Sequence, residues 1–376
     1  MNKSIPVLWL GIFIISCATH KSITLTDQSQ VKFIGEYDVP FNQIFENTTI
    51  GGLSGIDYDS KKNIYYLISD DRSSINPARF YSATISVNEK GINKVQFISV
   101  RNLLSPGGTV YPNTKQDPFH TPDPESIRLN KKTNQLVWSS EGERTIKKDT
   151  IVLEDPGITI ISTNGNYIDS FRLPVNMHMQ FIQKGPRQNG VFEGMSFTND
   201  YKKLLVSVEE PLFEDGPRAG LNDSSAWIRI IQFDVKTKKP QAQYAYQIDP
   251  VVYPASPPGA FKLNGVPDIL AINDHQVIVL ERSFSTGRKP CTIKVYLADI
   301  NNASDVSNIP SLVSENFEPV NKKLLLNMDD LGIYTDNIEG VTLGPKLPNG
   351  HQTLIFVADN NFSKDEVTQF LLFQIL

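Results

Sequence analysis

One pattern occurs five times in the amino-acid sequence. It consists of an apolar segment that begins near a serine or an acidic residue, a short turn, and a second apolar segment that ends in acidic residues. The opening residues are Ser54, Glu125, Glu193, Asp268 and Glu339, at intervals of 71, 68, 75 and 71 residues. Self-similarity at a fixed period is the signature of a repeat architecture, in which each repeat is one structural unit. Any fold for this chain must therefore contain five similar units.

Each repeat contains four segments that are typical of β-strands. In the first repeat, β-branched or aromatic residues nearly alternate with others over residues 53–58, 64–69, 79–87 and 94–101, with polar turns between them. Alternation of this kind predicts strands, and no window of helical length keeps a helical apolar period. Four strands in each of several repeats predict the blades of an all-β protein, a β-propeller.

The last repeat supplies only three such segments, residues 341–343, 353–358 and 369–375. Residues 31–39, which belong to no other repeat, can supply the fourth, so that the two ends of the chain share one blade. This closes the ring and removes exposed sheet edges, which favour aggregation. We predict five four-stranded blades closed by the N-terminal strand. Six blades, with a further sheet in the long loops, are the alternative.

The first residues have the features of an export signal. Lys3 is followed by a mostly apolar stretch over residues 5–15, which is too short to span a bilayer. Ile14-Ile15-Ser16-Cys17 is similar to a bacterial lipobox, in which the cysteine becomes lipid-modified and N-terminal. We predict a signal peptide over residues 1–16, a tether over residues 17–30 that begins at a lipidated Cys17, and one propeller domain over residues 31–376. An ordinary cleaved signal is the alternative.

A lipidated Cys17 would determine where the protein resides. Several acyl chains anchor a protein stably, whereas a single chain binds a membrane only marginally. Ala18 lacks the acidic side chain that can retain a lipoprotein at the inner membrane. We therefore expect an exported protein that is lipid-anchored in the bacterial cell envelope, at the outer membrane and facing the periplasm. We also expect it to be a monomer.

The charge and the cysteines exclude two classes of function. The chain has 36 Lys and Arg against 41 Asp and Glu, a net charge of −5, and no run of basic residues. A nucleic-acid partner is therefore not expected. The two cysteines, Cys17 and Cys291, allow neither a disulfide framework nor a cysteine-based zinc site. Cys291 is expected to be a small buried apolar residue.

The residues that open the repeats predict a metal site. The first strand of each propeller blade lines the central channel, so equivalent positions meet around one axis. Four carboxylates at one level would repel one another and raise their own pKa values. A Ca²⁺ ion, which takes six to eight oxygen ligands, would resolve the repulsion. The predicted metal ligands are Glu125, Glu193, Asp268 and Glu339. The alternative is that each acid only accepts hydrogen bonds from turn amides of its own blade.

A second set of acids lies where the second strand of each repeat ends: Asp70, Glu141, Glu209, Glu281 and Asp359. These side chains can surround the same channel mouth and orient the inner carboxylates or act as a general base. The candidate catalytic residues are Glu125, Glu193, Glu339, Glu209 and Glu141.

Two arginines follow these acids closely and are candidates for substrate binding. The planar guanidinium groups of Arg72 and Arg282 would suit the oxygens of a phosphate or a carboxylate. The alternative is that both form ion pairs that lock one blade to the next. Asn337 and Asn360 offer neutral oxygens and are predicted to bind substrate or to join the cation site.

Blocks of residues throughout the chain resemble those of one family. The blocks are Gly51-Gly52-Leu53-Ser54-Gly55 with Ser69-Asp70-Asp71-Arg72, Asp123-Pro124-Glu125-Ser126-Ile127, Phe192-Glu193-Gly194-Met195, Leu280-Glu281-Arg282, Asn337-Ile338-Glu339-Gly340, and Asp359-Asn360-Asn361-Phe362. They resemble the phytase-like family, described as "esterase-like activity of phytase", over residues 34–376. Ser126 stands where glycine is commoner in the family, which leaves Glu125 intact.

The resemblance implies an exported bacterial propeller that hydrolyses phosphate or carboxylate esters. Together with the acids it leads to a hypothesis: calcium at the channel mouth assists the cleavage of a small-molecule ester or phosphoester that Arg72 and Arg282 orient. One alternative is a non-enzymatic propeller that binds a ligand or protein in the cell envelope. Another is a lactonase-like metal hydrolase, which predicts the same metal in a less cationic pocket.

Overall fold

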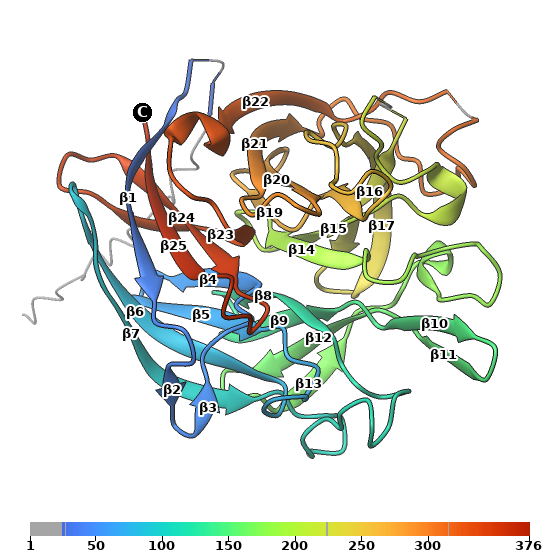
Figure 1. The fold of residues 1–376 in the computed structure, drawn as a ribbon, viewed down its shortest axis with the longest axis horizontal. Coiled ribbons are helices and arrows are strands. Elements are labelled where there is room, and N and C mark those ends of the chain that lie inside the picture. The colour runs from blue at the N-terminus through green and yellow to red at the C-terminus, as the bar shows by residue number, and fades with distance from the viewer. Residues whose placement is uncertain (1–24, 27, 223–224, 315) are drawn as a thin grey trace, which may run out of the picture.

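Five antiparallel sheets surround one axis and form a closed β-propeller (Figure 1). The computed structural model describes residues 25–376 except 27, 223–224 and 315. The prediction of five blades is confirmed, since the described part of the chain forms no sixth sheet of four strands. The predicted signal peptide and Cys17 lie outside the described residues, as does most of the predicted tether.

The first three blades each contain four strands in sequence order. Their bounds are β4 Gly55–Asp59, β5 Ile64–Ser69, β6 Arg79–Asn88 and β7 Gly91–Asn102; β8 Pro124–Asn130, β9 Gln135–Ser140, β12 Gly157–Ser162 and β13 Tyr167–Ser170; and β14 Phe192–Phe197, β15 Lys203–Val208, β16 Trp227–Asp234 and β17 Lys239–Gln247. The segments predicted for the first repeat agree with β4 to β7 to within three residues at each end.

The fourth blade has a divided first strand, and the fifth uses both ends of the chain. The strands are β18 Lys262–Gly265, β19 Ile269–Ala271, β20 Gln276–Ser285, β21 Thr292–Asp299 and β22 Asn321–Asn327, followed by β23 Asn337–Lys346, β24 Gln352–Asp359, β25 Thr368–Ile375 and β1 Val31–Val39. The remaining elements are the hairpins β2 Ile44–Phe45 with β3 Thr48–Thr49 and β10 Glu143–Lys147 with β11 Thr150–Glu154, and the short helices η1 Val175–Met177, η2 Phe213–Asp215 and η3 Met328–Leu331. No helix in the described residues is long and apolar enough to cross a membrane.

The ring closes where β1 pairs antiparallel with β25, with Val31 opposite Ile375 and Val39 opposite Thr368. The two strands run side by side in Figure 1. The backbone of Gln30 also exchanges two hydrogen bonds with Leu376. Leu25, in the last part of the predicted tether, is only 2% exposed. The chain is therefore held against the propeller before β1 begins.

The hydrophobic core is divided into five main clusters, one between each pair of neighbouring blades. The cluster between the fifth and first blades, for example, joins Phe370 and Ile355 to Ile56 and Tyr81. The other four lie between blades one and two, two and three, three and four, and four and five. Each blade buries one face on each neighbour, so no blade has a core of its own. This explains why the repeat must occur several times in one chain.

In three of the five repeats a glycine follows the opening residue, and it permits neighbouring channel strands to approach closely. A Cβ atom on Gly194 would lie 2.6 Å from the Cα of Asp268 in the next blade and 2.7 Å from the backbone nitrogen of Ile269. Gly55 faces the carbonyl oxygen of Glu125 in the same way, at 2.9 Å. The glycines of the repeated motif therefore have a packing role, and the adjacent acids are held at a narrow channel mouth.

Candidate metal centre and active-site pocket

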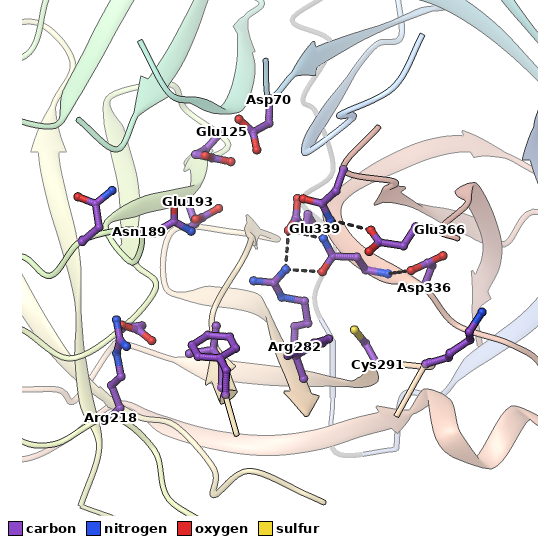
Figure 2. Close-up of a pocket in the computed structure, with 18 residues that line it drawn as sticks. Asp70, Glu125, Asn189, Glu193, Arg218, Arg282, Cys291, Asp336, Glu339 and Glu366 are labelled. Atoms are coloured by element: carbon purple, nitrogen blue, oxygen red, sulfur yellow. Dashed lines mark hydrogen bonds and ion pairs between the residues drawn. The ribbon is translucent and has the colours of Figure 1, made fainter. Parts of the chain in front are cut away.

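A pocket of about 360 Å³ opens where the channel strands begin, and its lining includes Asp70, Glu125, Glu193 and Glu339. Figure 2 shows Glu125 beside Asp70, with Glu193 on the same side of the pocket and Glu339 opposite, next to Arg282. Three of the four predicted metal ligands therefore line one pocket. The fourth, Asp268, does not line it.

Three glutamates form a close group at this pocket. Glu125 lies in β8, Glu141 directly follows β9, and Glu193 lies in β14. One carboxylate oxygen from each lies within 4.8 Å of the others. All three side chains are buried, with at most 7% of the residue exposed. Two neighbouring blades thus bring together acids that are far apart in the sequence.

A second group shares Glu125 with the first. Asp70 follows β5 in the first blade, Asp123 directly precedes β8, and their carboxylate oxygens lie within 4.8 Å of one another and of Glu125. The carboxylate of Glu125 therefore lies between two acidic groups. Glu339 belongs to neither group, although it lines the same pocket.

The crowding changes the acidity of these carboxyl groups. Burial raises the pKa of Glu125, Glu141 and Glu193 well above the usual range of glutamate, and neighbouring carboxylates raise it further. Burial likewise raises the pKa of Asp123 to about 6, against the lowering effect of Arg72. These carboxyl groups therefore bind protons more readily than free carboxyl groups do, and a bound cation would compete with those protons.

The hydrogen bonding of the Glu141 carboxylate indicates that the first group, Glu125, Glu141 and Glu193, can bind a metal ion. Its Oε1 accepts a hydrogen bond from the backbone N–H of Val191, whereas its Oε2 has no hydrogen-bond partner in a residue that is 1% exposed. Buried acceptors without a partner are uncommon and call for an explanation. Ca²⁺ and Mg²⁺ bind oxygen ligands, with carboxylates foremost. Glu125, Glu141 and Glu193 could therefore hold a hard divalent cation.

Arg282 links three blades beside this group. Its Nη2 lies 2.7 Å from Glu209 Oε1 and its Nη1 lies 2.5 Å from Glu339 Oε1. Asn337 accepts a hydrogen bond from Arg282 and donates one to Glu339 Oε1 at 2.8 Å. Burial raises the pKa of Glu339 to about 7, against the lowering effect of Arg282. The predicted residues Arg282, Asn337, Glu209 and Glu339 thus form one hydrogen-bonded cluster.

The assignment of Asp268 as a metal ligand needs correction. Arg128 Nη2 lies 2.6 Å from each of its carboxylate oxygens, which also accept hydrogen bonds from the backbone N–H groups of Ile269 at 2.9 Å and Val341 at 2.8 Å. Both oxygens are therefore already occupied inside the channel. Asp268 repeats the position of the other acids without sharing their surroundings.

Two further predicted residues have structural partners. Arg72 pairs with Glu143 at 2.7 Å and Asp123 at 3.5 Å, which joins the first blade to the second and does not place it in the pocket lining. Asn360 is 2% exposed, and its Oδ1 accepts hydrogen bonds from the backbone N–H groups of Gly52 and Phe362. The alternative of ion pairs between blades thus describes both Arg72 and Arg282. Cys291 is a free, buried cysteine, as predicted.

Three features of the site were missed in the sequence. Arg128 lies between the apolar residues Ile127 and Leu129 in β8, and its charge could have been noticed there. Asp123 lies two residues before Glu125, outside the repeated position. The apolar residues Phe261 and Phe284 line the same pocket as the acids, and nothing in the repeat pattern points to them.

The chain belongs to the phytase-like family, described as "esterase-like activity of phytase", whose model matches residues 48–362. The family and the propeller fold suggest a propeller hydrolase. None of the curated proteins that were compared matches the chain.

Several solved structures are similar in fold. An endo-arabinase from Bacteroides thetaiotaomicron has 13% identity over 87% of this chain and 94% of its own, with a TM-score of 0.40. An α-L-arabinofuranosidase from Lactobacillus brevis has 8% identity over 86% of this chain and 91% of its own, with a TM-score of 0.44. The Dos1 propeller has 6% identity over 87% of this chain and 69% of its own, with a TM-score of 0.36. These identities do not support a transfer of activity.

Proposed function

We propose that this protein is a metal-assisted hydrolase of phosphate or carboxylate esters, with a divalent cation, calcium by preference, held by Glu125, Glu141 and Glu193. The observation that carries the proposal is the convergence of these three buried carboxylates beside a pocket of about 360 Å³, with Glu141 Oε2 left without a partner. Family membership supports hydrolysis as the reaction class.

The cation, when bound, would polarise the scissile group and lower the pKa of an attacking water. The side chains of the protein determine where in the pocket the reaction takes place. Glu125 and Glu193 line the pocket, and one carboxylate oxygen of each lies within 4.8 Å of the other. Asp70 and Asp123 extend the acidic surface on the side of the first blade.

Glu339 is the candidate general base. Its Oε1 accepts hydrogen bonds from Arg282 and Asn337, which leaves Oε2 free to accept a proton from water at the pocket wall. In the reaction the water oxygen bonds to the carbonyl carbon or phosphorus, and the bond to the alcohol oxygen breaks. The departing alkoxide takes up a proton, so the products are an acid and an alcohol.

One observation favours a narrower candidate, a lactonase-like activity on a cyclic carboxylate ester. That alternative requires a less cationic pocket than phosphate binding does. Arg282 faces Glu209 and Glu339, and Arg218 lies 2.7 Å from Glu210. A lactone carries no charge and needs no unpaired arginine.

The experiment measures hydrolysis of aryl esters, aryl phosphates and a lactone with Ca²⁺, Mg²⁺ or Mn²⁺ and after chelation. We expect cation-dependent cleavage that falls at least about tenfold in Glu193→Gln when the cation is limiting. Glu318→Gln, an exposed acid outside the pocket, serves as the matched control. If no substrate is cleaved with any cation, the hydrolase proposal fails and a binding propeller becomes the better account.

The lipid anchor and its location also stay proposals. If Cys17 is acylated, the protein partitions into the membrane fraction and incorporates labelled palmitate, whereas Cys17→Ser appears in the soluble periplasmic fraction. Equal partitioning of the two forms would contradict the anchor.

A further inference from the structure

We propose that Phe261, Leu263 and Phe284 form a subsite for an uncharged apolar group of the substrate, an aryl ring or a short alkyl chain. The inference rests on the proposed hydrolase function and narrows its substrate class. The three side chains line the same pocket as Glu125, Glu193 and Glu339.

The fold builds this subsite by an extension of the fourth blade. The long strand β20 pairs with β19 along one half and with β18 along the other, so its second half continues toward the channel mouth. In that second half Leu263 is paired directly with Phe284. Phe261, which precedes β18, has its ring centroid 6.0 Å from that of Phe284. Leu263 and Phe284 therefore belong to a hydrogen-bonded sheet, which holds them in a fixed position relative to the acids.

The exposure of Phe261 indicates that this wall lacks an occupant within the protein. Its side chain is 55% exposed although it lines a pocket. Exposed apolar surface in a concave site commonly marks the place where a ligand binds, because the ligand removes that surface from water. An aromatic ring placed there would gain further from edge or offset contacts with the two phenylalanines.

The charged side chains of the pocket favour an uncharged occupant over a strongly anionic one. Seven of the lining residues are Asp or Glu, whereas only three are Arg or Lys. All three basic side chains face a carboxylate: Arg282 faces Glu209 and Glu339, Arg218 faces Glu210, and Lys289 lies 4.0 Å from Asp365. Two of these three, Arg218 and Arg282, already form close ion pairs with buried carboxylates, so among the described lining residues only the exposed Lys289 remains to meet a phosphate group. The pocket is therefore expected to bind a neutral ester better than a polyphosphorylated substrate.

The test compares two substrates with the same p-nitrophenolate leaving group: the uncharged p-nitrophenyl butyrate and the dianionic p-nitrophenyl phosphate. Wild type, Phe261→Ala, Phe284→Ala and the control Phe181→Ala are assayed with Ca²⁺. Phe181 is 59% exposed and does not line the pocket. The exposed side chain of Phe261 can be truncated without opening the core, so this variant remains informative if Phe284→Ala folds poorly.

We expect wild type to have a kcat/KM for the butyrate at least about tenfold above that for the phosphate. Phe261→Ala should raise KM for the butyrate about tenfold with little change in kcat, because apolar binding is lost equally in ground and transition states. Phe181→Ala should behave as wild type. A preference for the phosphate, or an unchanged KM for the butyrate in both pocket variants, would overturn the proposal.

A binding measurement separates this proposal from the hydrolase itself. Calorimetry with N-(4-nitrophenyl)butanamide, the amide analogue of the butyrate, requires no turnover. If wild type cleaves neither substrate but binds the amide more tightly than Phe261→Ala does, the hydrolase proposal fails and the subsite stands. If wild type and Phe261→Ala bind the amide equally, or neither binds it, the subsite fails whatever the hydrolysis shows.

Discussion

Arg128 and Asp268 form a buried ion pair of 2.6 Å that connects all five blades. Arg128, in the second blade, also donates to the carbonyl oxygens of Ile56 in the first and Met195 in the third. Asp268, in the fourth, accepts from the backbone N–H of Val341 in the fifth. Neither residue lines the acidic pocket, so the charges that hold the ring together are separate from the charges proposed to bind a cation.

Removing one member of this pair should destabilise the protein strongly. Arg128→Met leaves the buried carboxylate of Asp268 without its partner, and Asp268→Asn leaves the guanidinium unpaired. We expect either change to lower the free energy of unfolding by about 3–5 kcal/mol, as measured by urea denaturation. Arg101→Met, at an exposed position, is the control. A loss below about 1 kcal/mol, the range of a surface pair, would contradict a structural role for the channel pair.

The close approach of the channel strands predicts a difference between two glycines. Gly194→Ala places a methyl group against the backbone of Asp268 and Ile269, at 2.6 and 2.7 Å, so one strand must move. We expect a loss of about 1–3 kcal/mol in unfolding free energy. Gly157→Ala, in a strand with nothing within 4 Å of the added atom, should be tolerated. Equal stabilities of the two variants would contradict this packing role.

Glu154 predicts a specific pH dependence of stability. Burial raises its pKa to about 8, against the lowering effect of Arg72, and its Oε2 has no hydrogen-bond partner. A carboxyl whose pKa is higher in the folded protein stabilises it below the pKa of the unfolded chain. That contribution is lost as the pH rises through about 8. Glutamine resembles the protonated, uncharged form of glutamate, so Glu154→Gln should not lose this stability as the pH rises.

The melting temperatures of wild type and Glu154→Gln should therefore be similar near pH 5 and differ near pH 9. There we expect the variant to melt a few degrees higher. A difference that is the same at both pH values would show that Glu154 stays charged throughout.

The sequence was sufficient for the fold because the evidence for it is periodic. Five occurrences of one pattern predicted the blades, and the missing strand of the last repeat predicted that β1 pairs with β25. Alternation within each segment placed strand ends well where turns are short. It did not predict the inserted β10–β11 hairpin or the division of the first strand of the fourth blade into β18 and β19, because neither recurs in the other repeats.

The site was predicted in part, for a physical reason. Repeat position brought Glu125 and Glu193 together correctly, since equivalent strands face one axis. It could not distinguish Asp268, because what differs there is the partner, Arg128, which lies 140 residues away in the chain. Nor could it show that the side chain of Asn360 accepts hydrogen bonds from the backbone of Gly52 and Phe362. Which charges are already paired depends on contacts between blades.

The most direct test of the account is a calcium titration followed by melting temperature, in wild type, Glu193→Gln and the control Glu318→Gln. If Glu125, Glu141 and Glu193 hold a cation, binding to the folded state alone stabilises it by about 2.7 kcal/mol at a hundredfold excess over Kd. The melting temperature of wild type and of the control should then rise with calcium, and Glu193→Gln should lose most of that rise. A wild-type melting temperature that does not respond to calcium, or responds equally in Glu193→Gln, would contradict the metal centre.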